Sequence, residues 1–413
     1  MKVAVVGLGK IGLPLAVQYA SRGLAVIGYD IDPARVKSIN SGCCPLEGEE
    51  GLEEGLSAAL ADARLHTTTD PKYAISDASV VVLIVPVGLT PKRDPDFTQL
   101  DAATAAIAPH LPADALVIVE TTVPVGTTRS RVGVALRRTT LLAASPERVS
   151  SGRIFQDLRS YPKVIGTIDD ASWEKAKAFY RAALDAPSLI RVRDPETAEF
   201  VKLAEGMYRD VNIALASELA RYADSAGVDA NEAFAAANTQ PYSQLHQPGL
   251  GVGGHCLPVY PYFLPDDGTT RLPRLARDAN DAMAQYGVAK LEAAIGPLRD
   301  KTVLILGLAY RANVKESAHS SAFLLVDAVA ERGARAVLHD PLFSDEEVRA
   351  FGLEPVRSLP VPADAIIVQA WHDAYRDLDL RSFAGCLAVL DGRNALDRNA
   401  VEASGLLYVG IGS

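Results

Sequence analysis

The sequence predicts an α/β protein with two doubly wound, Rossmann-like domains joined by a long central helix. Two short apolar runs, 3–6 and 302–306, each lead into a glycine turn, and a helical segment follows in both places. Strands that alternate with helices are typical of a parallel sheet covered on both faces. Between these regions, 197–226 has apolar residues at helical spacing and almost no Gly or Pro, which predicts one long helix that ends near Gly227.

The remaining elements follow in chain order. In the first region we expect strands at 3–6, 25–29, 79–85 and 115–119, and a helix at 13–22. After the long helix we expect a helix at 230–237, a glycine-rich loop at 248–258 and a helical stretch at 272–298. The last region should contain strands at 302–306, 336–338, 365–369 and 388–390, and a helix at 322–331. The predicted domains are therefore 1–190, 191–298 and 299–413.

Composition excludes several classes of protein. The 413 residues are 48% hydrophobic and carry a net charge of −10, which suits a globular enzyme and argues against a nucleic-acid partner. Four cysteines are too few for a disulfide scaffold, and no apolar run reaches the roughly 18 residues of a membrane span. The seven histidines are scattered, so we expect no metal site. The N-terminus runs directly into a glycine loop rather than a cleavage site, so we expect a cytoplasmic protein.

The segment 7–12 matches the pattern G-x-G-x-x-G and follows the first strand. In that context Gly7 permits a tight turn, Gly9 lets the backbone approach a pyrophosphate, and Gly12 allows close packing of helix on sheet. Asp30 ends the next strand, where it can accept a hydrogen bond from a ribose 2′-hydroxyl and would repel a 2′-phosphate. We therefore predict NAD rather than NADP. A structural glycine turn without a cofactor is the alternative.

Cys256 stands at the end of the glycine-rich run 248–254. Glycines let a backbone approach a ligand closely, and a thiol presented there can act as a nucleophile. The plainer alternative is a buried cysteine beside a flexible turn. Lys202 and Arg209 lie seven residues apart on the long helix, on one face, where they could hold an anion or an oxyanion, or simply be solvated. Thr122 follows the strand at 115–119, so it would border the cofactor crevice or form a plain turn.

Five motifs taken together resemble the nucleotide-sugar 6-dehydrogenases. They occur in the expected order at 7–12, 145–149, 202–212, 253–256 and 307–310. The pattern covers essentially the whole chain. It is most similar to the branch that acts on UDP-N-acetylmannosamine and UDP-N-acetylglucosamine, with UDP-glucose dehydrogenase more distant.

The resemblance implies oxidation of a sugar C6 alcohol to a carboxylate with two NAD+. Cys256 would capture the aldehyde as a thiohemiacetal, which becomes a thioester before hydrolysis, and Lys202 would handle the proton and stabilise the oxyanion. The implied UDP-sugar contacts are Arg148, Val149, Arg209, Gly253, Tyr310 and Arg311. The implied NAD contacts are Gly7, Gly9, Lys10, Ile11, Gly12, Asp30, Arg35 and Thr122. The resemblance also implies a homodimer formed through the long helix.

Three positions depart from the family pattern. Tyr260 stands where an Asp is usual, Gly206 where an Asn is usual, and Ala318 where an Arg is usual. With Cys256 and Lys202 retained, we hypothesise that the enzyme accepts an unusual nucleotide sugar or hydrolyses its thioester slowly. The alternatives are an enzyme that stops after one two-electron oxidation, a UDP-glucose 6-dehydrogenase, and a degenerate homologue that only binds a nucleotide sugar. The yield of NADH separates complete oxidation to the carboxylate, which gives two NADH per sugar, from a single two-electron oxidation, which gives one.

Overall fold

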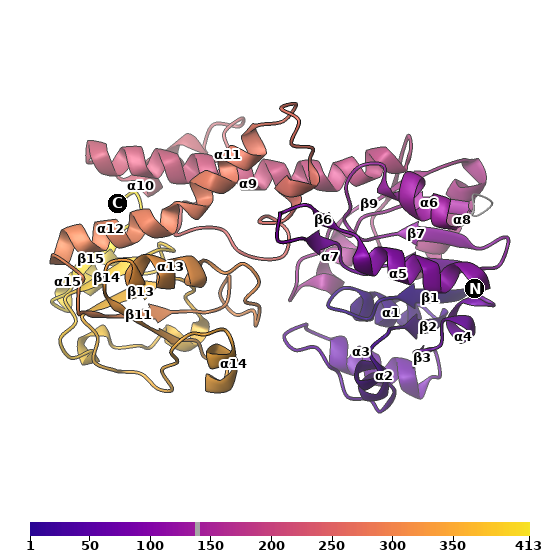
Figure 1. The fold of residues 1–413 in the computed structure, drawn as a ribbon, viewed down its shortest axis with the longest axis horizontal. Helices are drawn as coiled ribbons and strands as arrows, with labels where there is room; N and C mark the ends of the chain where they lie inside the picture. Colours follow the sequence, from indigo (N-terminus) through magenta and orange to yellow (C-terminus); the bar gives the residue numbers. More distant parts are fainter. Residues whose placement is uncertain (137–140) are drawn as a thin grey trace. The chain divides into compact units, whose positions relative to one another are not determined.

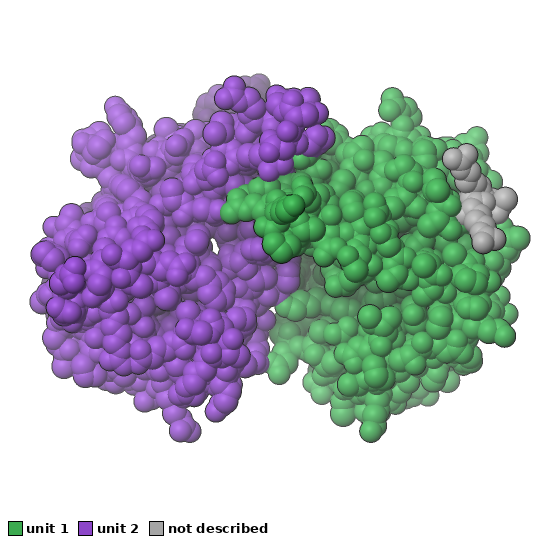
Figure 2. Space-filling model, viewed as in Figure 1, with its two compact units in different colours: residues 1–205, 262–264 green, residues 206–261, 265–413 purple. Residues whose placement is uncertain are grey.

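The computed structural model describes residues 1–136 and 141–413. These residues form two compact units, coloured separately in Figure 2. The first comprises Met1–Glu205 and Tyr262–Leu264, and the second comprises Gly206–Pro261 and Pro265–Ser413. Each unit contains its own sheet, so the prediction of two α/β regions is confirmed. The finer division at 190 and 298 stays a prediction.

The first unit is built on an eight-stranded sheet of order β10-β9-β8-β7-β4-β1-β2-β3. Its strands are β1 Lys2–Val6, β2 Ala25–Tyr29, β3 Leu65–Thr68, β4 Val80–Leu83, β7 Leu116–Val119, β8 Leu141–Ala144, β9 Lys163–Thr167 and β10 Leu189–Val192. Neighbours are parallel except β8 and β9. The strand order reverses at β1 and β4. At such a switch point an open α/β sheet leaves a crevice for ligands at the carboxyl ends of its strands.

The burial pattern explains why these segments are strands. Every residue of β4 and of β7 is buried, as expected where helices cover both faces of a parallel sheet. The helical elements are α1 Gly12–Ser21, α2 Pro33–Asn40, α3 Leu52–Ala61, α4 Pro71–Ile75, α5 Thr98–Ile107, η1 Ala108–His110, η2 Thr128–Val132, α6 Gly133–Ala135, α7 Ile154–Ser160 and α8 Asp170–Ala183. A short ribbon pairs β5 Gly88–Leu89 with β6 Pro95–Asp96. Asp32, Asp70 and Asp169 cap α2, α4 and α8 by accepting hydrogen bonds from first-turn N–H groups.

The helix α9, Pro195–Ala226, is a single helix of 32 residues, about 48 Å long at 1.5 Å per residue (Figure 1). It begins in the first unit and ends in the second. Gly227 follows with a φ of +68°, the left-handed conformation that commonly ends a helix. The predicted long helix and its terminus are therefore confirmed.

The second unit has a fully parallel five-stranded sheet of order β12-β11-β13-β14-β15. Its strands are β11 Thr302–Leu306, β12 Arg335–His339, β13 Ala365–Val368, β14 Ala388–Asp391 and β15 Leu407–Gly410. The other elements are α10 Ala230–Ala237, α11 Leu272–Asp281, α12 Met283–Ile295, α13 Ser321–Ala330, α14 Asp345–Ala350, η4 Asp373–Tyr375, η5 Leu380–Ser382 and α15 Arg398–Ala403. The short helix η3 Tyr260–Phe263 has residues assigned to each unit. Its order also reverses once, between β11 and β13.

The expected helical stretch at 272–298 is wrong in detail. The chain forms two helices, α11 and α12, that break at Ala282, and α12 ends at Ile295 because Gly296 takes a φ of +78°. Among the residues described, no helix is both long and apolar enough to cross a membrane.

Candidate active site

The glycine loop of the first unit joins β1 to α1. Gly7 has a φ of +95°, a conformation that glycine adopts without strain. A Cβ on Gly12 would lie 1.8 Å from the Gly7 carbonyl oxygen, so only glycine lets α1 pack this closely. A Cβ on Gly9 would meet nothing within 4 Å, which leaves that backbone open to a ligand. The loop thus has the open second glycine and the crowded third glycine that suit a dinucleotide pyrophosphate.

Asp30 follows β2 and is fastened to the same loop. Its Oδ2 accepts hydrogen bonds from the Leu8 N–H at 2.8 Å and from the Arg35 guanidinium at 3.1 Å. Its Oδ1 accepts one from the Asp32 N–H at 3.0 Å. A carboxylate offers about four acceptor positions, so a ribose hydroxyl can still be bound. The structure therefore brings Asp30, Arg35 and the glycine loop together, as the sequence predicted.

The other predicted NAD residues belong to the same unit. Ile11 is the N-cap of α1 and supplies no side-chain acceptor to its first turn. Lys10 is next to it, and burial lowers the pKa of its ammonium group. Thr122 is buried shortly after the end of β7. These positions fit an anion at the helix N-terminus and a nucleotide along the carboxyl ends of the strands.

The second unit repeats the turn of the first. The Gly307 N–H donates to the His339 carbonyl at 2.9 Å, and Gly307 has a φ of +103°. The Asp340 carboxylate accepts from the Leu308 N–H at 2.7 Å. These bonds match those around Gly7, so each unit presents a strand, a glycine turn and a carboxylate from the next strand. The two halves are alike in construction although they share no tandem repeat.

A buried cluster of charges lies beside the sheet of the first unit. The Lys163 ammonium lies 2.7 Å from the Glu147 carboxylate and 3.3 Å from that of Glu120, and Tyr180 donates to Glu120. Burial raises the pKa of Glu120. Burial alone would lower the pKa of Lys163, but the two carboxylates outweigh it and raise this pKa. Since Glu147 belongs to the motif at 145–149, the cluster holds that motif on the sheet.

Three residues predicted to act on the sugar also belong to the first unit. Arg148 makes an ion pair with Glu205 at 2.5 Å and donates to the Pro162 carbonyl at 3.1 Å. Val149 packs against the core, and Lys202 is partly buried on α9. Arg148 is therefore held in place by its own unit before any ligand binds.

Cys256 lies on a glycine-rich loop that packs against another segment of the second unit. A Cβ on Gly253 would lie 2.7 Å from the His319 carbonyl oxygen and 2.8 Å from the Tyr310 Cβ. Gly254 has a φ of +99° and a Cβ there would lie 3.1 Å from the Tyr310 ring. The glycines therefore serve packing as well as access, which the sequence pattern alone did not distinguish.

Backbone hydrogen bonds fix the two ends of this turn. The Gly254 N–H donates to the Ala318 carbonyl at 2.8 Å. The Cys256 carbonyl accepts from the N–H groups of Val259 and Tyr260, at 3.1 and 2.9 Å. The thiol is free and partly buried, as are those of Cys44 and Cys386. That it reaches the nicotinamide stays a prediction, because the NAD loop belongs to the other unit.

A buried ion pair that the sequence reasoning missed supports this loop. The Arg277 guanidinium lies 2.7 Å from the Asp210 carboxylate and 2.5 Å from that of Asp281, and it donates to the Val252 carbonyl at 3.4 Å. Asn280 donates to Asp210 at 2.9 Å. Burial raises the pKa of Asp210 despite the opposing effect of Arg277. The pair therefore ties α9, α11 and the Cys256 loop together.

A second missed pair involves the residue before Cys256. The His255 Nε2 lies 2.6 Å from the Glu316 carboxylate, which is 8% exposed. Nothing in the sequence pattern links these residues, which are 61 positions apart.

Two departures from the family pattern touch each other. A Cβ on Gly206 would lie 3.4 Å from the Tyr260 ring. A side chain at 206 would therefore be a direct neighbour of the Tyr260 ring, at an ordinary contact distance. The third departure, Ala318, serves the loop through its carbonyl oxygen rather than its side chain.

The other predicted sugar contacts of the second unit are arranged in two places. The Arg311 guanidinium lies 5.7 Å from the centroid of the Tyr310 ring, within cation–π range. Arg209 is exposed on α9. Burial lowers the pKa of His246, and the positive charge of Arg209 lowers it further. Thus Gly253, Tyr310 and Arg311 lie together, and Arg209 lies near His246.

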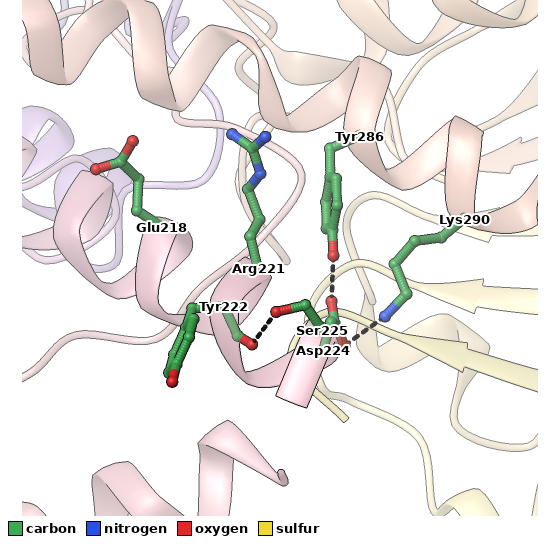
Figure 3. A pocket seen from close by; sticks show the side chains of 7 residues that line it. All are labelled: Glu218, Arg221, Tyr222, Asp224, Ser225, Tyr286 and Lys290. Carbon is green, nitrogen blue, oxygen red and sulfur yellow. Dashed lines mark hydrogen bonds and ion pairs between the residues drawn. The ribbon is translucent and has the colours of Figure 1, made fainter. Parts of the chain in front are cut away.

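An open hollow of about 570 Å³ lies beside the end of α9 (Figure 3). Its lining residues are Glu218, Arg221, Tyr222, Asp224, Ser225, Tyr286 and Lys290. No predicted site residue is among them, so we do not assign the hollow to catalysis. Over the described ranges, no group of three or more His, Cys, Asp or Glu is placed to hold a metal ion.

Comparison with known proteins decides the family. Three family models match the chain in order. They are the NAD binding domain at 1–184, the central domain at 196–281 and the UDP binding domain at 304–398 of the UDP-glucose/GDP-mannose dehydrogenase family. The chain belongs to the UDP-glucose/GDP-mannose dehydrogenase family. It is an NAD-dependent oxidoreductase that acts on nucleotide sugars, and the resemblance seen in the motifs is confirmed.

Individual members of this family match over nearly the whole chain. The UDP-N-acetyl-D-mannosamine dehydrogenase of Pyrococcus horikoshii is 33% identical over 100% of this chain and 99% of its own. The NDP-N-acetyl-D-galactosaminuronic acid dehydrogenase of Ralstonia nicotianae is 33% identical over 91% of this chain and 92% of its own.

Solved structures of family members agree with the fold. The P. horikoshii UDP-D-ManNAc dehydrogenase has a TM-score of 0.88 at 32% identity, covering 100% of this chain and 99% of that one. A UDP-glucose dehydrogenase from Pyrobaculum islandicum has a TM-score of 0.89 at 28% identity, covering 100% and 97%. Because both substrate types appear among such close folds, the fold alone does not select the sugar.

Proposed function

We propose that this enzyme oxidises the C6 alcohol of a UDP-N-acetylhexosamine to a carboxylate, with UDP-N-acetylmannosamine as the first substrate to test. Relatives named for N-acetylhexosamine derivatives match the chain over 91% or more of its length, which supports this branch. The observation that carries the proposal is Cys256, presented by a glycine loop that is packed against the segment around Tyr310. UDP-glucose is the second candidate, because a UDP-glucose dehydrogenase shares the fold closely.

The proposed chemistry comprises two successive oxidations, alcohol to aldehyde and thiohemiacetal to thioester, of which the second takes place on the Cys256 thiol. When bound, NAD would supply the hydride acceptor, one NAD+ for each of the two oxidations. The Cys256 thiolate adds to the C6 aldehyde and forms a thiohemiacetal, whose oxidation gives a thioester. Water then releases the carboxylate and restores the thiol. The Lys202 ammonium would stabilise negative charge on the C6 oxygen and take up or return its proton.

The remaining predicted residues are proposed to hold the two ligands. Arg148, Arg209 and Arg311 would bind the diphosphate and uronate charges, since guanidinium groups match phosphate and carboxylate geometry. Tyr310 and the backbone at Gly253 and Val149 would contact the nucleotide sugar. The glycine loop, with Lys10 and Ile11, would hold the NAD pyrophosphate, while Asp30, Arg35 and Thr122 would contact the rest of the cofactor.

The departures at Gly206, Tyr260 and Ala318 support a slower or altered last step. The phenol of Tyr260 fills the space beside Gly206, and neither residue supplies a carboxylate or amide there. We therefore propose that both oxidations proceed and that hydrolysis relies on other groups. Product identification tests this directly, because a normal uronate formed at ordinary rates would remove the reason for it.

We also propose that the enzyme is a homodimer formed through α9. Tyr208, Leu215, Leu219 and Tyr222 lie on this helix at spacings of seven, four and three residues, and these residues are 55%, 48%, 37% and 71% exposed. Such a row is one face of a helix, and an exposed apolar stripe of this length favours association. Light scattering should give twice the chain mass, and Leu219→Asp should reduce it to one.

A cytoplasmic location is proposed as well. All four cysteines are free, as is usual in a reducing compartment. Fractionation of cells that express the tagged chain would test it.

The decisive experiment measures NADH release with UDP-N-acetylmannosamine, UDP-N-acetylglucosamine, UDP-glucose and UDP-galactose, followed by mass analysis of each product. Two NADH per sugar and a uronate support the proposal, and one NADH with an aldehyde supports the two-electron alternative. No NADH with any sugar supports a binding-only homologue. Cys256→Ser should abolish uronate formation, with Cys43→Ser as the control because Cys43 is an exposed free thiol outside the site. Unchanged activity of the Cys256 variant would contradict its role.

A further inference from the structure

Hydrolysis of a thioester needs a group that accepts a proton from water. From 248 to 261 the chain contains no Asp, Glu or Lys, although this segment carries Cys256. It does contain His255, and histidine is the side chain whose ordinary pKa lies closest to neutral pH. The segment that carries Cys256 therefore also contains His255, a residue that can act as a general base near neutral pH.

A carboxylate from elsewhere in the second unit orients this histidine. The Glu316 Oε2 lies 2.6 Å from the His255 Nε2, and its Oε1 accepts a hydrogen bond from the Ala318 N–H at 2.9 Å. The carbonyl of Ala318 in turn accepts from the Gly254 N–H at 2.8 Å. One short stretch of chain thus holds both the carboxylate that orients His255 and the loop that carries Cys256.

This geometry selects the tautomer of the ring. A carboxylate only accepts hydrogen bonds, so Nε2 carries the proton and Nδ1 carries the lone pair. The His255 side chain is 56% exposed, so water reaches it, whereas Glu316 is buried. A buried carboxylate behind an exposed imidazole is the arrangement that stabilises the imidazolium formed when the ring takes a proton.

We propose that His255, oriented by Glu316, is the general base that hydrolyses the thioester on Cys256. The inference rests on the proposed function. The water oxygen bonds to the acyl carbon while one water proton passes to Nδ1. Collapse of the tetrahedral adduct breaks the carbon–sulfur bond, and the leaving thiolate receives the proton back from the imidazolium. The new carboxylic acid loses its remaining proton to solvent. Glu316 is a positioning residue that acts through His255.

The test separates oxidation from hydrolysis in the full-length enzyme. With NAD+ and the sugar that the panel identifies, rapid mixing measures the NADH formed in the first turnover and the steady rate that follows. His255→Ala should keep the first-turnover burst of two NADH per site while the steady rate falls about 100-fold or more. Intact-protein mass should then show an acyl group on Cys256. Glu316→Gln should show the same pattern more weakly, and Glu316→Asp should recover part of the rate.

Hydroxylamine gives a second readout, because it attacks a thioester with less help from a base. It should accelerate the steady rate of His255→Ala far more than that of the unaltered enzyme and yield the hydroxamate. His66→Ala serves as the matched control, since His66 is exposed on β3 and its ring packs on that of Tyr73. His255→Gln covers the case in which the alanine variant does not fold.

Each outcome decides the question. Loss of the burst in the His255 and Glu316 variants would show a pair that merely fastens the loop and would overturn the proposal. Normal steady turnover without acyl-enzyme would also overturn it. If the unaltered enzyme forms no NADH with any UDP-sugar, the proposed function itself fails, and the inference fails with it.

Discussion

Removing the charge of Arg277 tests the energetic weight of the buried ion pair beside the Cys256 loop. Arg277 is 1% exposed, and its partner Asp210 is fully buried. In Arg277→Met, Asp210 keeps the amide of Asn280 but loses its counter-ion, while its second oxygen, Oδ2, has no hydrogen-bond partner even in the intact protein. Breaking a buried pair from one side costs about 3–5 kcal/mol, because an uncompensated charge stays in the interior.

The assay follows the second unit alone. The chain has two tryptophans, Trp173 in the first unit and Trp371 in the second. In a Trp173→Phe background, urea unfolding monitored by fluorescence therefore reports on the second unit. Arg277→Met should lower its free energy of unfolding by about 3–5 kcal/mol, and Asp210→Asn combined with it should recover part of the loss.

A matched control is available on the surface of the same unit. Arg335 pairs with Glu354, but the two side chains are 62% and 48% exposed. Such pairs contribute little, so Arg335→Met should barely shift the midpoint. A loss below about 1 kcal/mol for Arg277→Met, or a double variant no more stable than the single one, would refute the view that an uncompensated charge is the main cost.

Three further predictions follow from the same contacts. Gly12→Ala should weaken NAD binding about tenfold or more in titrations followed by NADH fluorescence. The new Cβ forces α1 away from β1 and misplaces N–H donors to the pyrophosphate that are worth about 1–3 kcal/mol each. Unchanged affinity would contradict this prediction. Gly206→Asn alone should lower kcat, because the new side chain neighbours the Tyr260 phenol. Gly206→Asn combined with Tyr260→Asp should restore kcat to that of the unaltered enzyme or raise it further. Equal kcat values for the single and double variants would count against an interaction between the two positions. Burial lowers the pKa of His339 below its ordinary 6.5, so the unfolded chain binds the proton more readily and the free energy of unfolding should fall as the pH drops below about 6.5. His339→Gln should flatten that slope, measured by Trp371 fluorescence.

Local patterns predicted the central strands of both sheets and the long helix. The strands β4 and β7 are continuous apolar runs because helices cover both faces of the sheet. Each strand could therefore be predicted from its own residues, without knowledge of the strands that pair with it. The long helix was equally clear, because its only Gly, Gly206, did not interrupt the apolar spacing. The edge strands β3 and β10 were missed, since their short runs alternate or lack buried apolar residues and so carry a weaker apolar signal. The interior strands β8 and β9 were missed too.

The same limit applies to the candidate site. The NAD loop could be predicted from a local pattern, Gly7, Gly9, Gly12 and Asp30, in which each residue meets one steric or hydrogen-bonding requirement. The structure brings these residues together. Their counterpart in the second unit lacks the full glycine pattern. Only the tertiary structure reveals this second glycine turn, because Asp340 accepts hydrogen bonds from the N–H groups that follow Gly307.

The sequence by itself determined the two α/β halves, the helix that links them and the NAD loop, and it predicted Cys256 as the nucleophile, because these depend on spacing within a few turns of chain. Tertiary structure alone decided which distant groups support that nucleophile. His255 meets Glu316 across 61 positions and Arg277 meets Asp210 across 67, and no periodicity encodes such pairs. They form because folding removes charged and polar groups from water, and each one then needs a partner from whatever part of the chain the packing brings beside it.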